Sequence, residues 1–217
     1  MSHSAFLRAR RPEHKQQRRE AILAAARELA LTSGVRNVSL GGVAYAVGLA
    51  KSNVGRYFGT REEIYLELTA EGWQAWGSAV LERLRDASGQ DGVVDALAEP
   101  FETLPLFCDL LSQVSTSLEH NVSVPAARAF KYLKHEVTVD LCGPVMAAHP
   151  VLNETEATEL IVAATALAGL LYPIDNPSPT LAELYAQEPE LAAMCPPFLP
   201  TLKRLLSAVA AGLPTLR

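Results

Sequence analysis

The feature that most constrains this fold is a change of pattern around a single glycine, Gly48. Before it, apolar residues recur at the i, i+3, i+4 and i+7 spacing that buries one face of a helix, at Leu40, Val43, Ala44 and Val47. After it, Leu49 fills the turn and a second helix carries side chains that can reach phosphates or base edges: Lys51, Ser52, Asn53, Arg56 and Tyr57. The pattern predicts a helix-turn-helix whose second helix lies in a nucleic-acid groove.

Composition favours packed helices around an aliphatic core. The 217 residues suffice for one large or two small domains, and 49% are hydrophobic but only 6% aromatic. The longest apolar run, residues 160–174, is shorter than the roughly 20 residues that span a bilayer, and no apolar segment follows the charged N-terminus. We therefore expect no membrane contact, no secretory signal and a cytoplasmic location. The spacing of Cys108, Cys142 and Cys195 suits neither a disulfide framework nor a zinc site, so no metal or cofactor is expected.

The charge is strongly asymmetric along the chain, although the formal total is only -5. Residues 1–61 hold 11 Lys and Arg against 3 Glu, a net charge of +8, and the remainder carries -13. A basic module joined to an acidic body is typical of a protein that meets a polyanion at one end. The alternative, that the basic end is only a solubilising tail, fits less well because the charge coincides with the helical motif.

Helix start and stop signals divide the chain further. Residues 1–14 have little to bury and are predicted to form a flexible basic arm. A helix is expected from about residue 15 to 33, closed by Gly34, and Ser39 is placed to cap the next helix or to bind a phosphate there. Thr60, three residues before Glu63, predicts a capping box that opens a long helix to about residue 85.

The rest of the chain also has helical patterns, and no alternating strand pattern or internal repeat competes with them. Residues 173–200 contain seven prolines and are predicted to form a long connection with one helical block near 181–187. The other expected helices cover residues 91–99, 105–120, 125–148, 153–173 and 202–213. The fold class is therefore predicted to be all-α.

The first 65 positions resemble the TetR family of bacterial transcriptional regulators. The resemblance is in the order of the following residues: Ile22, Ala25, Ala26, Leu29, Gly34, Val38-Ser39-Leu40, Ala44, Gly48-Leu49, Tyr57-Phe58 and Arg61-Glu62. It implies a homodimer in which a three-helix N-terminal module binds DNA and a larger helical region binds a ligand and the partner subunit. The expected divisions are an arm over 1–14, a helix-turn-helix domain over 15–61, and a ligand-binding and dimerisation domain over 62–217.

Chemistry and the resemblance together indicate the DNA contacts. Tyr57, Arg61 and Lys51 are expected at phosphates, and Ser52, Asn53 and Arg56 at base edges, where Arg favours guanine and Asn favours adenine. Val54 and Phe58 are expected in the core. Two positions depart from the family pattern, because Ala50 stands where a capping Ser or Thr is common and Gly55 where a Tyr often touches the backbone. The alternative for each polar residue is a solvated helix face.

The resemblance also implies a ligand site and a dimer interface in the body. Aromatic and apolar residues that could line a ligand cavity, or equally form packing, are Trp73, Trp76, Phe101, Phe107, Leu111, Tyr132 and Tyr172. The expected dimer-forming residues, which could instead belong to an ordinary internal helix pair, are Leu160, Ala164, Leu167, Leu171, Leu202, Leu205, Leu206 and Val209.

The resemblance implies a ligand-responsive repressor that binds a palindromic DNA operator as a homodimer and is released by an unknown small apolar effector. Half-sites one turn apart require recognition helices about 34 to 36 Å apart. An enzyme is the main rival, but no nucleophile elbow, phosphate-cradling glycine loop or metal-binding helix occurs in the sequence, so we expect no catalysis. A second rival is an interaction protein that keeps the fold but does not bind an operator. The departures from the family pattern at Ala50 and Gly55 would explain the loss of DNA binding.

Overall fold

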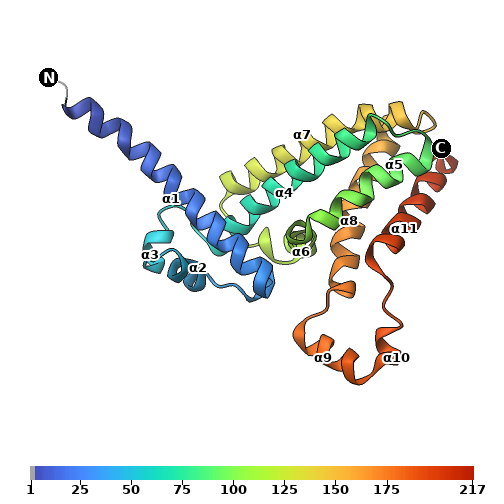
Figure 1. The fold of residues 1–217 in the computed structure, drawn as a ribbon. Coiled ribbons are helices and arrows are strands. Elements are labelled where there is room, and N and C mark those ends of the chain that lie inside the picture. The colour runs from blue at the N-terminus through green and yellow to red at the C-terminus, as the bar shows by residue number, and fades with distance from the viewer. Residues whose placement is uncertain (1–2) are drawn as a thin grey trace.

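A computed structural model describes residues 3–217, with side chains from Glu13 onward, and contains only helices and connecting turns in that range. Figure 1 shows a small helical module at one end, a larger helical body, and a hairpin that projects from the body. The α-helices are α1 (His3–Ser33), α2 (Leu40–Ala46), α3 (Lys51–Val54), α4 (Arg61–Leu84), α5 (Gly89–Ala98), α6 (Pro105–Gln113), α7 (Val124–Ala148), α8 (Glu154–Asp175), α9 (Pro179–Gln187), α10 (Pro189–Ala192) and α11 (Phe198–Gly212). Short 3-10 segments occur at Val35–Asn37, Glu99–Thr103 and Leu213–Leu216, and a π-helical turn at Val114–Leu118.

The N-terminal module consists of α1, α2 and α3, and its core contains the apolar positions predicted from the sequence. Ile22 and Ala26 of α1 are fully buried, and Val43 and Ala44 of α2 pack in the same core. The predicted flexible arm differs from the structure, because α1 already begins at His3; residues 1 and 2 lie outside the described residues. Ala, Leu, Arg and Glu make up more than half of residues 3–14 and favour a helix, although Pro12 lies within it.

The long helix α4 joins the module to the body. Thr60 caps it, since the Thr60 hydroxyl accepts a hydrogen bond from the backbone N–H of Glu63 at 3.1 Å. The Glu63 carboxylate does not close a reciprocal capping box, because it accepts instead from the N–H groups of Gly59 and Ser123. The second of these bonds brings the start of α7 to the start of α4, and the two helices run side by side (Figure 1).

The core of the body is an aromatic cluster contributed by α4, α6 and the segment between α5 and α6. Trp76 stacks on Phe101 with ring centroids 5.5 Å apart, and Trp73 meets Trp76 and Phe107 edge-on at 5.6 and 5.9 Å. The indole N–H of Trp76 donates to the carbonyl of Leu97 at 3.1 Å, so its one polar group is satisfied inside the core. Favourable ring geometry and full burial make this cluster the centre of the body.

Helices α8 and α11 pack against each other and against α5, α6 and α7. Asn153 and Glu156 form a complete capping box at the start of α8. The helix continues past the predicted end near Pro173 to Asp175, because a proline lacks only one N–H and the last carbonyls still find partners such as the Asn176 N–H. In the described residues α8 alone is long and apolar enough to cross a membrane, but nearly half of its apolar window is buried inside the body, as in a core helix.

Candidate nucleic-acid interface

The turn between α2 and α3 has the geometry of a helix-turn-helix. Ser39 caps α2, because its hydroxyl accepts the N–H of Gly42 at 3.0 Å. Gly48 follows α2 with φ +65. Glycine adopts this left-handed conformation with little strain, whereas a residue with a Cβ is strained there. The Leu49 N–H then returns to the carbonyl of Ala44 at 2.9 Å, which fixes the direction in which α3 leaves the turn.

Helix α3 is short, and further hydrogen bonds extend its helical path. It spans Lys51–Val54 and has no side-chain cap, because Ala50 occupies the cap position. Helical turns continue beyond Val54. The Gly55 N–H donates to the Lys51 carbonyl at 3.2 Å, and the Phe58 N–H donates to the Val54 carbonyl at 3.1 Å. Val54 and Phe58 are buried in the core of the module, so the opposite side of residues 51–58 faces the solvent.

Four predicted contact residues lie on that outward side. Lys51, Ser52, Asn53 and Arg56 are exposed, whereas Tyr57 is half-buried against the core. Ser39 is exposed as well, so its hydroxyl hydrogen can still be donated while the oxygen caps α2. The exposed set combines two cations, two hydroxyls and one amide, which is a suitable surface for phosphates and base edges.

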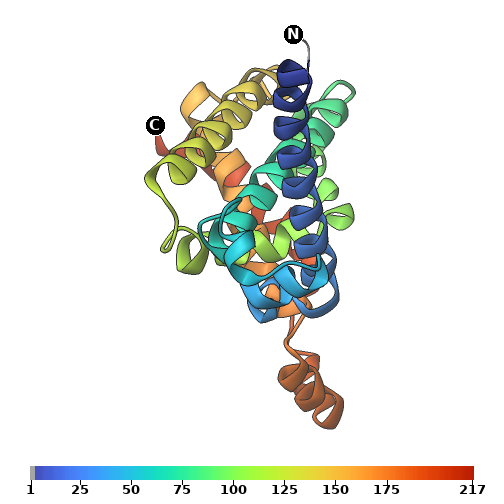
Figure 2. The ribbon, with the colours of Figure 1, turned by 90° about the vertical axis from the view of Figure 1, so that its left-hand side faces the viewer.

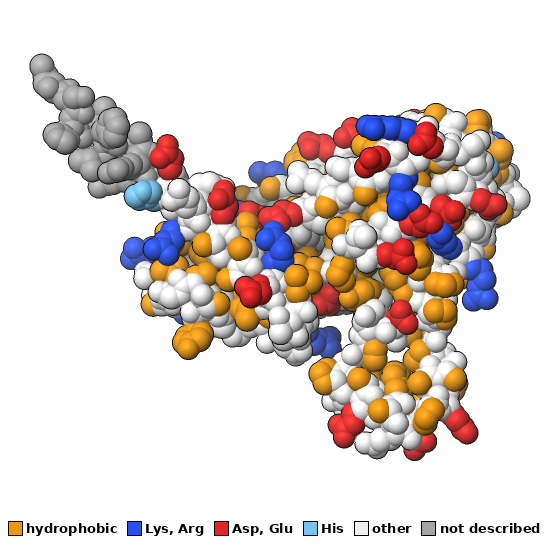
Figure 3. Space-filling view, in the orientation of Figure 1, with side chains coloured by type: hydrophobic (Ala, Val, Ile, Leu, Met, Phe, Trp, Pro, Cys, Tyr) orange, Lys and Arg blue, Asp and Glu red, His pale blue; other side chains and the backbone are white. Residues whose placement is uncertain are grey.

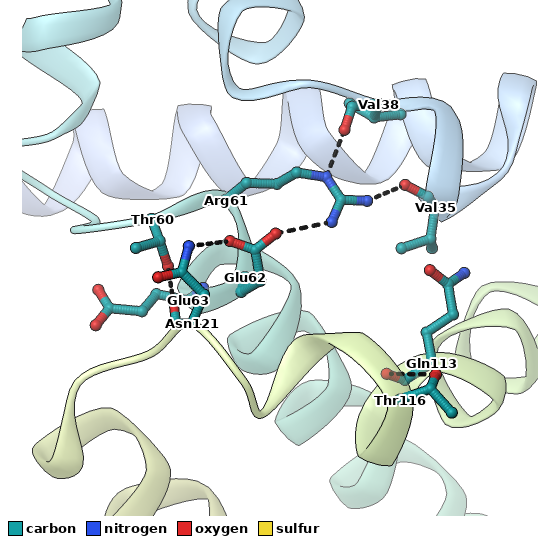
Figure 4. A network of polar contacts seen from close by, with 9 residues as sticks. All are labelled: Val35, Val38, Thr60, Arg61, Glu62, Glu63, Gln113, Thr116 and Asn121. Carbon is teal, nitrogen blue, oxygen red and sulfur yellow. Dashed lines mark hydrogen bonds and ion pairs between the residues drawn. The ribbon is translucent and has the colours of Figure 1, made fainter.

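Arg61 does not join this surface. Its Nε and Nη2 donate to the carbonyl oxygens of Val38 and Val35, and its Nη1 lies 3.1 Å from the Glu62 carboxylate (Figure 4). The guanidinium also lies over the ring of Tyr65, 4.8 Å from its centroid, and only 16% of the side chain is exposed. The expected phosphate contact is corrected accordingly: this arginine holds the start of α4 to the turn that precedes α2.

Other basic residues of the module are also used internally. Arg19 pairs with Glu67, donates to the Tyr57 carbonyl at 3.3 Å and lies over the Phe58 ring at 4.2 Å. Arg27 pairs with Glu71 of α4. These contacts position α3 and α4 on α1, so the formal charge of the first 61 residues overstates what is available to a polyanion.

Tyr45 belongs to the surface of the module but is missing from the sequence-based set. It lies on α2 and is 89% exposed, the highest value among the large apolar and aromatic side chains with described burial. Its position outside the Leu40, Val43, Ala44 and Val47 stripe could have indicated exposure. Its relation to the α3 surface could not be read from that pattern.

Polar contacts connect the module to the body around the turn at residues 34–38. The Val35 N–H donates to Asp109 of α6 at 2.8 Å, and Gln113 donates to the other Asp109 oxygen at 3.0 Å. On the α4 side, Thr60 donates to the Asn121 carbonyl at 2.7 Å and Asn121 donates to Glu62 at 3.1 Å (Figure 4).

The Glu63 carboxylate belongs to the same junction. Burial opposes its ionisation, but the hydrogen bonds from Ser123 and Gly59 outweigh burial and hold the pKa of Glu63 below its ordinary value. The carboxylate therefore stays charged at neutral pH, and it holds the start of α7 against the start of α4.

The seven residues predicted to line a ligand cavity do not form one open site. Trp73, Trp76, Phe101 and Phe107 fill space against one another. Leu111 and Tyr172 are half-buried against the core, and the ring of Tyr172 meets Phe198 edge-on at 5.7 Å. Tyr132 is separate, since it lies on α7 with 63% of its surface exposed, and the prediction for this residue is corrected. An open groove of about 420 Å³ lies between α4 and α7, but it is lined by other residues, including Gln74, Ser78, Leu133, Glu136, Val137 and Asp140.

Most residues predicted at a dimer interface are buried inside the protomer. Leu160, Ala164, Leu202 and Leu206 are fully buried and Leu171 is nearly so, and for these five the prediction is corrected because α8 and α11 use them to hold the body together. Leu167, Leu205 and Val209 pack half-buried against the same core, keep part of their surface open and stay predicted dimer contacts. The large aliphatic side chains that α8 leaves exposed are Val162, Leu170 and Ile174, with Leu170 66% exposed.

No group of three or more metal-ligating side chains occurs within the described part of the chain. Two family models account for almost the whole sequence: "Bacterial regulatory proteins, tetR family" matches residues 22–68, and "Tetracyclin repressor-like, C-terminal domain" matches residues 69–217. The chain belongs to the TetR family. It is a DNA-binding transcriptional regulator with an N-terminal helix-turn-helix and an all-helical C-terminal domain.

Solved structures show the same TetR fold at low sequence identity. The fatty acid degradation regulator FadR from Bacillus halodurans is 11% identical, with a TM-score of 0.52 over 90% of this chain and 97% of that one. SCO7518 from Streptomyces coelicolor A3(2), described as a transcriptional regulator, is 20% identical, with a TM-score of 0.51 over 89% and 98%. No curated protein sequence matches this chain.

Proposed function

We propose that the protein is a homodimeric repressor that binds a palindromic operator through the exposed side of α3. The observation that carries this proposal is the division of one short segment into buried Val54 and Phe58 and outward-facing Lys51, Asn53 and Arg56. Arg56 and Asn53 contact base edges, and Lys51, together with Ser39, Ser52 and Tyr57, contacts the backbone or neighbouring bases. Operator binding places the protein in the cytoplasm and requires no catalysis.

Dimerisation uses the exposed apolar side of α8. Val162, Ala166, Leu170 and Ile174 follow one another at helical spacing and are exposed in the protomer. Such a stripe is costly in water and typical of an interface when it lies on a helix that is otherwise part of the core. A two-fold axis at this face presents two α3 helices to successive major grooves.

An apolar effector releases the operator by displacing α6. The aromatic cluster is filled in the protomer, so a ligand needs α6 to move, and α6 carries the Asp109 that binds the Val35 N–H. The π-helical turn at Val114–Leu118 directly follows α6 and is a place where helical hydrogen bonding is already irregular. Movement of α6 then reaches the helix-turn-helix through one direct contact.

Recovery of genomic fragments retained by the purified protein at moderate salt tests operator binding. Arg56→Ala is expected to relax preference at one base position and to cost about 1–3 kcal/mol of binding free energy, as for lost base contacts. Arg128→Ala, which removes an exposed arginine of α7, is the matched control and leaves the recovered site unchanged. Retention of no specific fragment by the wild type would favour the interaction protein over the repressor, and turnover of a bound ligand would favour an enzyme.

Sedimentation equilibrium tests the dimer face. Leu170→Glu is expected to yield monomers, because it buries an unpaired charge in the interface. Val139→Glu on α7 changes another exposed apolar residue of the body, 55% exposed against 66% for Leu170, and is expected to leave the dimer intact. Equal dimerisation of both variants would place the interface elsewhere.

A further inference from the structure

The segment between α8 and α11 leaves the body as a separate hairpin, which we name the α9–α10 arm and define as residues 176–197. In Figures 1 and 2, drawn at right angles, the arm projects away from the other helices. Its two helices, α9 and α10, pack on each other, and none of its residues is buried in the protomer. The body therefore provides almost no support for this hairpin.

The arm has more apolar surface than an isolated hairpin can keep in water. Four large apolar residues are exposed on it, Leu181, Leu184, Leu191 and Met194, with Met194 78% exposed. Figure 3 shows hydrophobic side chains gathered on the arm. Helices shorter than about 12 residues are marginal in water without packing, and α9 and α10 have 9 and 4 residues. A second surface that covers these side chains would supply the missing stabilisation.

The charge of the arm excludes polyanions as that surface. The arm has three acidic residues, Glu183, Glu188 and Glu190, and no Lys, Arg or His. A segment with a net charge of -3 is repelled by DNA and by anionic lipid headgroups. A protein surface is left as the chemically suitable partner.

The position of the arm indicates which protein surface covers it. It begins two residues after Ile174, the last exposed apolar residue of α8, so the arm continues the apolar surface formed by Val162, Leu170 and Ile174. Whatever covers α8 lies beside the arm. We infer that the arm packs against the second subunit of the dimer and that each subunit clasps the other in this way. This inference rests on the homodimer proposed above, and a two-fold axis makes the clasp reciprocal.

Equilibrium dimerisation of arm variants provides the first test. The double variant Leu184→Glu, Met194→Glu changes side chains that no body contact buries, so it leaves the protomer folded and is expected to weaken dimerisation at least tenfold. Thr180→Glu adds a charge at an exposed polar position of α9 and is the matched control, with wild-type dimerisation. Wild-type dimerisation of the double variant would overturn the inference while leaving the α8 interface in place.

Hydrogen exchange of the arm provides an independent readout that does not alter it. In the wild-type dimer, amides of Pro179–Gln187 are expected to exchange at least tenfold more slowly than in the Leu170→Glu variant, whose change lies on α8. Equal exchange in both proteins, fast or slow, would overturn the inference, because protection would then not depend on the second subunit. A wild type that stays monomeric even on operator DNA would refute the dimer proposal itself, and the clasp with it.

Discussion

Replacement of Gly169 by alanine should weaken the contact between α8 and α6. Gly169 is buried, and a Cβ placed on it would lie 2.9 Å from the carbonyl carbon and 3.1 Å from the carbonyl oxygen of Leu111. These are backbone atoms, so no rotamer change removes the clash, and α6 must move. Overpacking of this kind costs about 1–3 kcal/mol, whereas alanine in place of glycine within a helix gains about 0.5–1 kcal/mol.

The balance predicts that Gly169→Ala lowers the free energy of unfolding by about 1–2 kcal/mol. For a chain of this size the melting temperature should fall by about 3–6 °C, measured by calorimetry. Gly212→Ala is the matched control, because a Cβ at this helical position meets nothing within 4 Å. It should be neutral or slightly stabilising. If Gly169→Ala melted at or above the wild-type temperature, the close approach of α6 and α8 could not be tight, and the reasoning would fail.

Three other outcomes follow from side-chain surroundings. Lys51→Ala should reduce the slope of operator affinity against salt concentration by about one phosphate contact, whereas Arg61→Ala should lower the melting temperature without that change in slope, since Arg61 binds backbone carbonyls. Hydrogen bonds from Arg217 lower the pKa of Glu156 to about 2, so the stability that this carboxylate adds is present above pH 4.5 and lost as the pH falls toward 2. Urea unfolding at pH 7 should show Glu156→Gln less stable than the wild type, and the difference should vanish near pH 2. Burial raises the pKa of Cys108 to about 12, so alkylation of the native protein at pH 8, followed by mass spectrometry, should leave this thiol unmodified.

The helix-turn-helix could be predicted from sequence because its signals are local. The apolar positions Val43 and Ala44 determine which face of α2 is buried. The turn after α2 needs φ +65, which glycine, here Gly48, adopts without strain. The exposure of Asn53 and Arg56 follows from their phase relative to Val54. No contact from a distant part of the chain is needed for these inferences.

The function of Arg61 could not be predicted because its partners are distant in sequence. Its charge favours a phosphate, but the carbonyls of Val35 and Val38, 26 and 23 residues earlier, lie beside it once α4 packs on the module. The side of α8 that we propose as the dimer face could not be located from the sequence for another reason. Leu160 and Leu170 are equally apolar, and periodicity cannot tell which of two apolar sides faces the body's own helices and which faces a second subunit.

The contacts around Val35 would pass a movement of α6 directly to the helix-turn-helix. The N–H of Val35 is bound by Asp109 of α6, and its carbonyl is bound by Arg61 at the start of α4. The two polar groups of one residue are therefore held by two different helices of the body. If α6 moves relative to α4, at least one of these bonds must break or the turn at residues 34–38 must move with it. Because Ser39 begins α2 directly after this turn, either response changes the position of the helix-turn-helix.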